Sequence, residues 1–256
     1  MSAQPNVIAC RLSSYAPFEA GAYEHIASLG LRHVEIAVPP PEALDTTAAE
    51  LERHGLRASS LHGECDLGRA DADALVAEQM PAFERLDCGI MFTSVRRGEI
   101  PVDTAYRRLR AAADVAAQHG VTLSLETHPD LITNAGVALQ TIQAVDHTHV
   151  RINFDTANVH FYNRGVDTVE QLRRLVSYVA SVHLKDTDGA YRHWHFPALG
   201  GGVVDFAGVF RVLDAAGFRG PCTLEIEGIE GEERTERLVR ERIAASVAYL
   251  RTLGRF

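Results

Sequence analysis

Four short apolar segments of this 256-residue chain each end in a side chain that binds metal ions: residues 123–126, 152–155, 181–183 and 222–225. A charged group at the end of a buried strand is costly unless it is paired or bound to a cation. The four segments follow one another at intervals of roughly 30 to 40 residues, with helical patterns between most of them. This regular order predicts one shared divalent-metal site.

The four terminal residues are Glu126, Asp155, His183 and Glu225, which together offer three carboxylates and one imidazole. Such a set suits Mn²⁺, Mg²⁺, Co²⁺ or Zn²⁺ and disfavours a structural zinc site of the thiolate type. Each residue alone would be interpreted as a salt-bridge or helix-cap partner; the four together favour a metal site. Glu227 is an alternative to Glu225, because residues two apart on a strand share a face.

A shared site requires elements that bring distant residues together, and strand-like and helix-like patterns alternate along the chain. Strands are predicted at residues 7–12, 34–38, 58–62, 90–95, 121–127, 150–155, 179–185 and 222–227. Helices are predicted at residues 17–29, 42–54, 71–86, 102–119, 136–145, 169–178, 206–216 and 232–253. In a parallel barrel the C-terminal strand ends converge on the axis, which would make the four ligands neighbours.

Eight strand–helix units without a break in composition predict an α/β fold, a single (β/α)8 TIM barrel that spans residues 1–256 as one domain. A length of 256 residues is close to the roughly 250 typical of this barrel, although two smaller domains would also fit. An open doubly wound sheet is the alternative, but it normally has a Gly-rich first turn, which residues 11–15 lack.

Composition limits the class of partner and the compartment. The net charge of −9 argues against binding to a phosphate backbone, so no nucleic-acid partner is expected. No apolar run is long enough to span a membrane, and residues 1–6 do not resemble a secretory signal. The four cysteines are scattered without a CxxC pair, which is typical of reduced thiols, so a cytoplasmic protein is predicted.

The same segments resemble the xylose isomerase-like TIM-barrel superfamily, which includes sugar phosphate isomerases and epimerases and the abasic-site endonucleases. The resemblance is carried in order by residues 60–63, 121–128, 153–158, 182–186, 199–206 and 222–225, and it covers nearly the whole chain. It implies the same four metal ligands. In the epimerase branch it also implies that Glu126 and Glu225 form the acid/base pair, which moves a proton at the carbon beside a carbonyl.

One position departs from the family pattern. Many relatives have Asp-x-x-His after the sixth strand, whereas this chain has Asn158 at the fourth position and a histidine at His160. Asparagine can hydrogen-bond a hydroxyl but cannot shuttle protons. The departure leaves the metal site intact, puts the substrate in doubt, and weakens the endonuclease interpretation. Asn158 and His160 are both predicted to bind substrate.

Four further residues are predicted to contact substrate. His62 ends the third strand, where it either faces the pocket or packs under a loop. Asp186 belongs to the family-like Lys-Asp pair and either orients His183 or touches substrate. Residues 186–204 form the longest connection, which is usually functional, with a solvated insertion as the alternative. Its Trp194 and His195 are expected to fold over a sugar, on whose apolar face a tryptophan can stack.

Supporting roles are predicted for five more residues. Glu35 either orients its neighbours or forms a structural ion pair. His128 and Lys185 lie next to ligands in the sequence and are expected behind them. Arg96 and Arg97 either clamp a carboxylate or phosphate or lie on the surface.

These features predict a divalent-metal-dependent isomerase or epimerase of a small ketose or keto-sugar, with or without a phosphate group. The alternative is a metal-dependent dehydratase of the inosose or dehydroshikimate type, which expels a β-hydroxyl from the same enolate. Hydrolysis of nucleic acid and a non-catalytic barrel that binds a sugar or a protein are weaker alternatives. Assembly into a homo-oligomer is left open.

Overall fold

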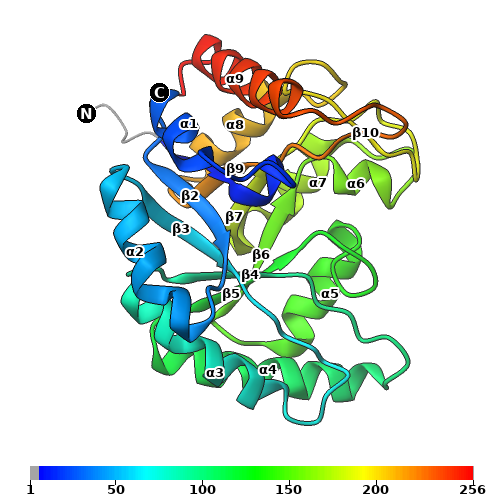
Figure 1. The fold of residues 1–256 in the computed structure, drawn as a ribbon. Coiled ribbons are helices and arrows are strands. Elements are labelled where there is room, and N and C mark those ends of the chain that lie inside the picture. The colour runs from blue at the N-terminus through cyan, green and yellow to red at the C-terminus, as the bar shows by residue number, and fades with distance from the viewer. Residues whose placement is uncertain (1–5, 256) are drawn as a thin grey trace.

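Eight parallel strands close into a barrel in this computed structural model, which describes residues 6–255 (Figure 1). In chain order they are β1 (Val7–Arg11), β2 (His33–Ala37), β3 (Arg57–His62), β4 (Ile90–Thr93), β5 (Thr122–Glu126), β6 (Val150–Asp155), β7 (Val179–Leu184) and β9 (Pro221–Leu224). Each strand pairs with the next, and β9 pairs with β1 to close the ring. The predicted (β/α)8 TIM barrel is therefore confirmed. The expectation about a secretory signal concerns residues 1–6, of which 1–5 lie outside the described part.

Helices connect the strands on the outside of the barrel. They are α1 (Ala22–Ser28), α2 (Leu44–Arg53), α3 (Ala72–Arg85), α4 (Val102–Gln118), α5 (Ala135–Val145), α6 (Asn158–Phe161), α7 (Thr168–Leu175), α8 (Phe206–Ala215) and α9 (Glu236–Thr252). Short 3₁₀ turns occur at Leu12–Tyr15, Pro41–Ala43 and Val176–Tyr178. No helix within residues 6–255 is both long and apolar enough to cross a membrane. All four cysteines are buried and free.

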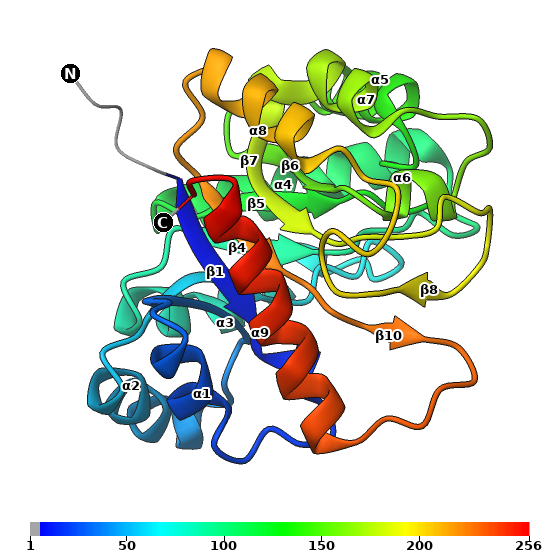
Figure 2. The same cartoon turned by 90° about the horizontal axis from the view of Figure 1, so that it is seen from above.

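Two helices begin later than their apolar periodicity predicts, for local reasons. The first begins at Ala22 rather than at residue 17, because Gly21 adopts a left-handed φ of 70° that a helix interior cannot contain. The last begins at Glu236 rather than at residue 232, because the Thr235 side chain accepts a hydrogen bond from the Leu238 amide and caps the helix there. α9 then lies between α1 and α8 (Figure 2). Arg240 of α9 donates to the Ala20 carbonyl just before α1, and Arg255, just beyond α9, pairs with Asp214 of α8.

Strand alternation separates an apolar outer face of the barrel from a polar interior. On β5, Leu123 and Leu125 alternate with Ser124 and Glu126, and all four are buried. The same alternation on β6, β7 and β9 gives an inner layer of short polar side chains: Ser124, Asn153, Ser181 and Thr223. The Ser124 and Ser181 hydroxyls lie 2.7 Å apart across the interior. Period-two geometry therefore places the next inward residue of each strand, the candidate ligand, one layer above them.

Two very short strands lie beyond the C-terminal ends of the barrel strands. β8 (His195–Phe196) and β10 (Gly228–Ile229) pair antiparallel and extend from one side of the barrel (Figure 2). The predicted eighth strand, residues 222–227, accordingly ends at Leu224, and the chain after it forms part of this second small sheet. The sheet joins the loop after β7 to the loop after β9.

Candidate metal centre

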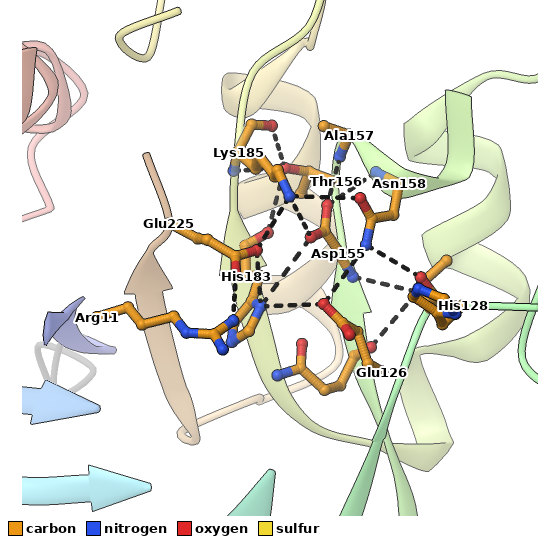
Figure 3. A network of polar contacts seen from close by, with 12 residues as sticks. Arg11, Glu126, His128, Asp155, Thr156, Ala157, Asn158, His183, Lys185 and Glu225 are labelled. Carbon is orange, nitrogen blue, oxygen red and sulfur yellow. Dashed lines mark hydrogen bonds and ion pairs between the residues drawn. The ribbon is translucent and has the colours of Figure 1, made fainter. Parts of the chain in front are cut away.

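The four predicted ligands meet at the C-terminal mouth of the barrel (Figure 3). Glu126 and Asp155 end β5 and β6, His183 lies next to the end of β7, and Glu225 directly follows β9. The Glu225 amide donates to the Leu184 carbonyl at 3.1 Å, which continues the strand pairing by one residue. One ligand atom from each residue lies within 4.8 Å of the others, and all four residues are buried.

Two buried polar atoms in this cluster have no hydrogen-bond partner. They are Asp155 Oδ2 and His183 Nδ1. The imidazole nitrogen lies 3.2 Å from Glu225 Oε2 and 3.8 Å from Glu126 Oε1, but neither contact is aligned as a hydrogen bond. Buried polar atoms are normally paired, so these two call for a further partner. A divalent cation fits, because both atoms face the same carboxylate-rich space.

The far side of the His183 ring is fixed by Glu35. His183 Nε2 lies 3.0 and 3.2 Å from the two Glu35 oxygens, and the Ser60 hydroxyl donates to Glu35 at 2.7 Å. Burial alone would lower the pKa of His183, but the Glu35 and Glu225 carboxylates outweigh it and raise that pKa well above its ordinary value. A carboxylate behind the imidazole is the usual arrangement for a metal-binding histidine, since it fixes which nitrogen faces the ion.

Two cations lie against the carboxylates. Arg11 pairs through Nη1 with Glu225 and lies 3.5 Å from Glu35, while Lys185 Nζ lies 3.3 Å from Glu225 and 3.7 Å from Asp155. Burial opposes ionisation of Glu225, but Lys185, His183 and Arg11 hold its pKa well below the usual range. Asp155 is different, because burial raises its pKa to about 7. Glu225 is therefore held ionised, whereas Asp155 takes up a proton easily when no cation is bound.

Sequence reasoning missed Arg11 and Ser94. The Ser94 hydroxyl donates to Glu126 Oε2 and fixes that carboxylate from the β4 side. Arg11 is the last residue of β1, so the rule that found the ligands, a charged residue that ends an apolar strand, also points to it. No comparable signal marks Ser94, which is one of many serines in the chain.

Asn158 lies within the centre, whereas His160 does not. Asn158 Nδ2 donates to Glu126 Oε1 at 3.4 Å, and its Oδ1 accepts from Lys185 Nζ at 3.4 Å. His160 was expected to contact substrate as well, but its Nε2 lies 2.7 Å from the Thr168 hydroxyl, on the side of α7. The reason is the single-turn helix α6, which carries both residues and turns side chains two positions apart to different faces.

His62 lies beside a hollow that also contains Ser94, whose hydroxyl donates to Glu126. The hollow is lined by His62, Thr93, Ser94, Arg96 and neighbouring residues of the loop after β3. Burial lowers the pKa of His62, and the Arg11 guanidinium, 3.3 Å away, lowers it further, so the ring is neutral at pH 7. The interpretation of His62 as a pocket residue therefore agrees with its position.

Asp186 has a different role from the one expected. It neither orients His183 nor faces the cluster, because its carboxylate accepts hydrogen bonds from four backbone amides, those of Thr187, Gly200, Gly202 and Val204. A Cβ on Gly202 would lie 2.4 Å from this carboxylate, so the close approach requires glycine. Asp186 therefore shapes the long loop after β7, and its contact with substrate stays a prediction.

Trp194 and His195 lie on that loop but point to different surroundings. The half-exposed Trp194 ring packs edge-on against Phe161 and Phe196, 6.0 Å from Lys185 Nζ, at the margin of the centre. His195 instead stacks with His193, and its contact with substrate stays a prediction.

The remaining candidates surround the centre. Glu227 pairs with Lys185 and does not belong to the four-ligand cluster, which favours Glu225 as the ligand. His128 hydrogen-bonds Tyr162 at 2.7 Å and Arg96 at 3.0 Å. Arg97 pairs with Asp130 at the surface.

A closed parallel barrel with three carboxylates and an imidazole gathered at its C-terminal mouth defines a TIM-barrel protein with a candidate metal centre. A family model described as xylose isomerase-like TIM barrel matches residues 23–253, and the chain belongs to this family. Among curated proteins it is similar to a 3-dehydroshikimate dehydratase of Bacillus anthracis, 32% identical over 34% of this chain and 31% of that one. It is also similar to an inosose dehydratase of Erwinia tasmaniensis, 31% identical over 45% of this chain and 44% of that one. The chain thus covers less than half the length of these relatives.

A longer alignment joins the chain to an L-ribulose 3-epimerase of Methylomonas sp., 24% identical over 80% of this chain and 78% of that one. Solved structures show the same fold. A xylose isomerase domain protein from Planctomyces limnophilus superposes with a TM-score of 0.76 at 22% identity, over 97% of this chain and 96% of that one. A probable 3-DHS dehydratase from Bacillus anthracis superposes with a TM-score of 0.77 at 16% identity, over 95% of this chain and 98% of that one.

Proposed function

We propose that this chain is a divalent-metal-dependent isomerase or epimerase of a small ketose or keto-sugar. The observation that carries the proposal is the position of Glu126 and Glu225 on either side of His183 Nδ1 (Figure 3). Two carboxylates that flank one space can remove a proton from one face of a substrate carbon and return it to the other. The longest curated alignments support this choice, since they are with proteins named L-ribulose 3-epimerase and ketose 3-epimerase.

The surrounding residues give the two glutamates different tasks. Glu225 is held ionised by Arg11 and Lys185, so it carries no proton of its own and is open to accept one from the substrate. Glu126 is held by Ser94 and Asn158, and Ser94 also lines the hollow at the mouth, so Glu126 lies one hydrogen bond away from the space where a sugar would enter. When bound by Glu126, Asp155, His183 and Glu225, a divalent ion (Mn²⁺, Mg²⁺, Co²⁺ or Zn²⁺) supplies charge stabilisation for an oxyanion beside the carbonyl.

Solvent exchange tests the proposal directly. The metal-loaded protein is incubated with a panel of ketoses, free and phosphorylated, in D2O, and deuterium at the carbon beside the carbonyl is measured by NMR. Metal-dependent deuterium uptake is expected, with a loss of about 10²- to 10⁴-fold in Glu126→Gln. Glu99→Gln, an exposed glutamate near the mouth, is the matched control and should retain the wild-type rate. No uptake with any sugar would refute the proposal.

A dehydratase is the second candidate, and Lys185 is the observation that favours it. Its buried ammonium lies among Asp155, Glu225 and Glu227, where it can donate a proton to a departing β-hydroxyl. The relatives of higher identity are named dehydratases, although they align over less than half of the chain. Loss of water from a cyclic keto-polyol would produce a conjugated enone, so a rise in ultraviolet absorbance would distinguish this reaction from epimerisation.

The remaining expectations belong to the same proposal. We expect residues 1–256 to act as one domain in the cytoplasm on a small sugar, with or without assembly into a homo-oligomer. The net charge of −9 predicts no binding to nucleic acid. Fluorescence anisotropy with a labelled DNA duplex at low salt tests that prediction, and tight, salt-dependent binding would contradict it.

A further inference from the structure

A second group of metal-binding side chains lies outside the barrel mouth, on the long loop after β7. It consists of Asp188, His193 and His195, each of which offers one ligand atom within 4.8 Å of the others. Unlike the barrel cluster, it contains two imidazoles and one carboxylate, and its members are exposed or half-exposed. Neither the proposed reaction nor any residue of the barrel centre uses these side chains.

The loop backbone brings the two imidazoles together. The His195 amide donates to the His193 carbonyl at 2.9 Å, which closes a three-residue turn, and the two rings stack with centroids 5.6 Å apart. The Trp194 ring between them packs against Phe161 and Phe196. The Trp194 ring is therefore turned toward the two phenylalanines, whereas the His193 and His195 rings lie against each other and reach solvent.

The carboxylate comes from the start of the same loop. Asp188 Oδ2 lies 2.5 Å from His193 Nδ1, and Asp188 Oδ1 accepts from the Ala190 amide at 3.0 Å. The His195 ring nitrogens form no hydrogen bond with any described residue, so they are free to bind an ion. The segment is held at both ends, at Asp186 by four backbone amides and at β8 by pairing with β10.

We propose that Asp188, His193 and His195 form a second metal site, which takes an imidazole-preferring ion such as Zn²⁺. Tetrahedral zinc with ligands at about 2.0 to 2.2 Å needs ligand atoms about 3.3 to 3.6 Å apart. The Asp188–His193 pair, now 2.5 Å apart, must open by about 1 Å, and His195, whose ligand atom lies within 4.8 Å of the others, must move inward by at most about 1.5 Å. Exposed side chains make such movements at little cost. Solvent completes the coordination.

The two sites differ in the ions that they prefer. Three carboxylates and one imidazole accept Mg²⁺ or Mn²⁺, whereas two imidazoles and one carboxylate favour Zn²⁺, Ni²⁺ or Cu²⁺ over Mg²⁺. An ion bound by Asp188 and His195 would also link the two ends of residues 188–195. This link would restrain the loop that carries Trp194 to the margin of the barrel centre.

Equilibrium dialysis of the untagged protein against Zn²⁺, with bound metal measured by atomic emission, tests the proposal. Two equivalents are expected for the wild type and one for His195→Ala. Asp155→Asn, which disables the barrel centre, is expected to bind one equivalent of Zn²⁺, at the loop site. His149→Ala is the matched control: His149 also lies beside another histidine, with ring centroids 6.1 Å apart, and its loss should leave the wild-type stoichiometry.

Trypsin gives an independent readout, because the exposed Arg192 lies between the ligands. Zn²⁺ should slow cleavage at Arg192 severalfold in the wild type and in Asp155→Asn, but not in His195→Ala. If His195→Ala binds as much Zn²⁺ as the wild type, the loop site is refuted. If the wild type binds one equivalent that is lost in His195→Ala and kept in Asp155→Asn, the loop site stands and the barrel metal centre fails.

Discussion

Replacing Glu35 by glutamine tests whether the carboxylate behind His183 prepares it for a metal. Glu35 is fully buried, and both of its oxygens lie within 3.2 Å of His183 Nε2. Glutamine keeps the size and one acceptor oxygen but removes the charge. The imidazole becomes less basic, so metal affinity should fall by about 10- to 100-fold, as for other partners of metal-binding histidines. That loss corresponds to about 1.4 to 2.8 kcal/mol of binding free energy.

Isothermal titration of the metal-free protein with Mn²⁺ measures the change, since the loop cluster is not expected to take this ion. The pKa of His183, raised by Glu35 and Glu225, should also fall in Glu35→Gln, and NMR titration of the ring proton would show it. Glu50→Gln removes a half-exposed glutamate of α2 that pairs with Arg53 and should change neither quantity. Affinity within twofold of the wild type in a folded Glu35→Gln protein would refute this role.

Three further changes test the electrostatics and the loop. Folding raises the pKa of Asp155 to about 7, against about 3.9 in the unfolded chain, and it also raises the pKa of His183. The folded protein therefore holds more protons than the unfolded chain, and the metal-free fold loses stability as pH rises and these protons leave. The gap in Tm between metal-loaded and metal-free protein should therefore widen from about pH 5 to pH 8; a gap that narrows would contradict the assignment. Lys185→Met leaves several carboxylates without their buried partner, so urea unfolding in EDTA should show a loss of about 3 to 5 kcal/mol. A loss below about 1 kcal/mol would show that Lys185 is not their main counter-charge. Asp186→Asn weakens the bonds to four loop amides and should speed trypsin cleavage at Arg192, with an unchanged rate as the contrary result.

The sequence predicted the barrel and the meeting of the four candidate ligands because both depend on local, periodic signals. A charged residue that ends an apolar strand keeps its inward direction when the strand joins a parallel barrel, as Glu126 and Asp155 show. Binding of a metal by these residues stays a prediction. The length of β9 is less predictable from the sequence. Glu225 and Glu227 would lie on the same face of a longer strand, and only the pairing of β10 with β8 shows that the strand ends at Leu224.

Loop residues were harder to place because their contacts come from tertiary structure. Nothing in the sequence pattern marks α6, the single turn that separates the directions of Asn158 and His160. The role of Asp186 depends on Gly200 and Gly202 folding back toward it, which no periodicity encodes. Arg11 was within reach of sequence reasoning, since it ends a strand as the ligands do.

The pairing of β8 with β10 has a consequence for engineering the mouth of the barrel, where the proposed substrate would bind. The two strands bridge the connection that follows His183 and the one that follows Glu225, so a change in the backbone of one connection disturbs the pairing of the other. A graft of one connection from a relative would lose its pairing partner and displace Trp194, whose carbonyl accepts from the Glu230 amide at 2.8 Å. Exchange of the two connections as a pair should preserve folding, and libraries that vary substrate preference should be built on both together.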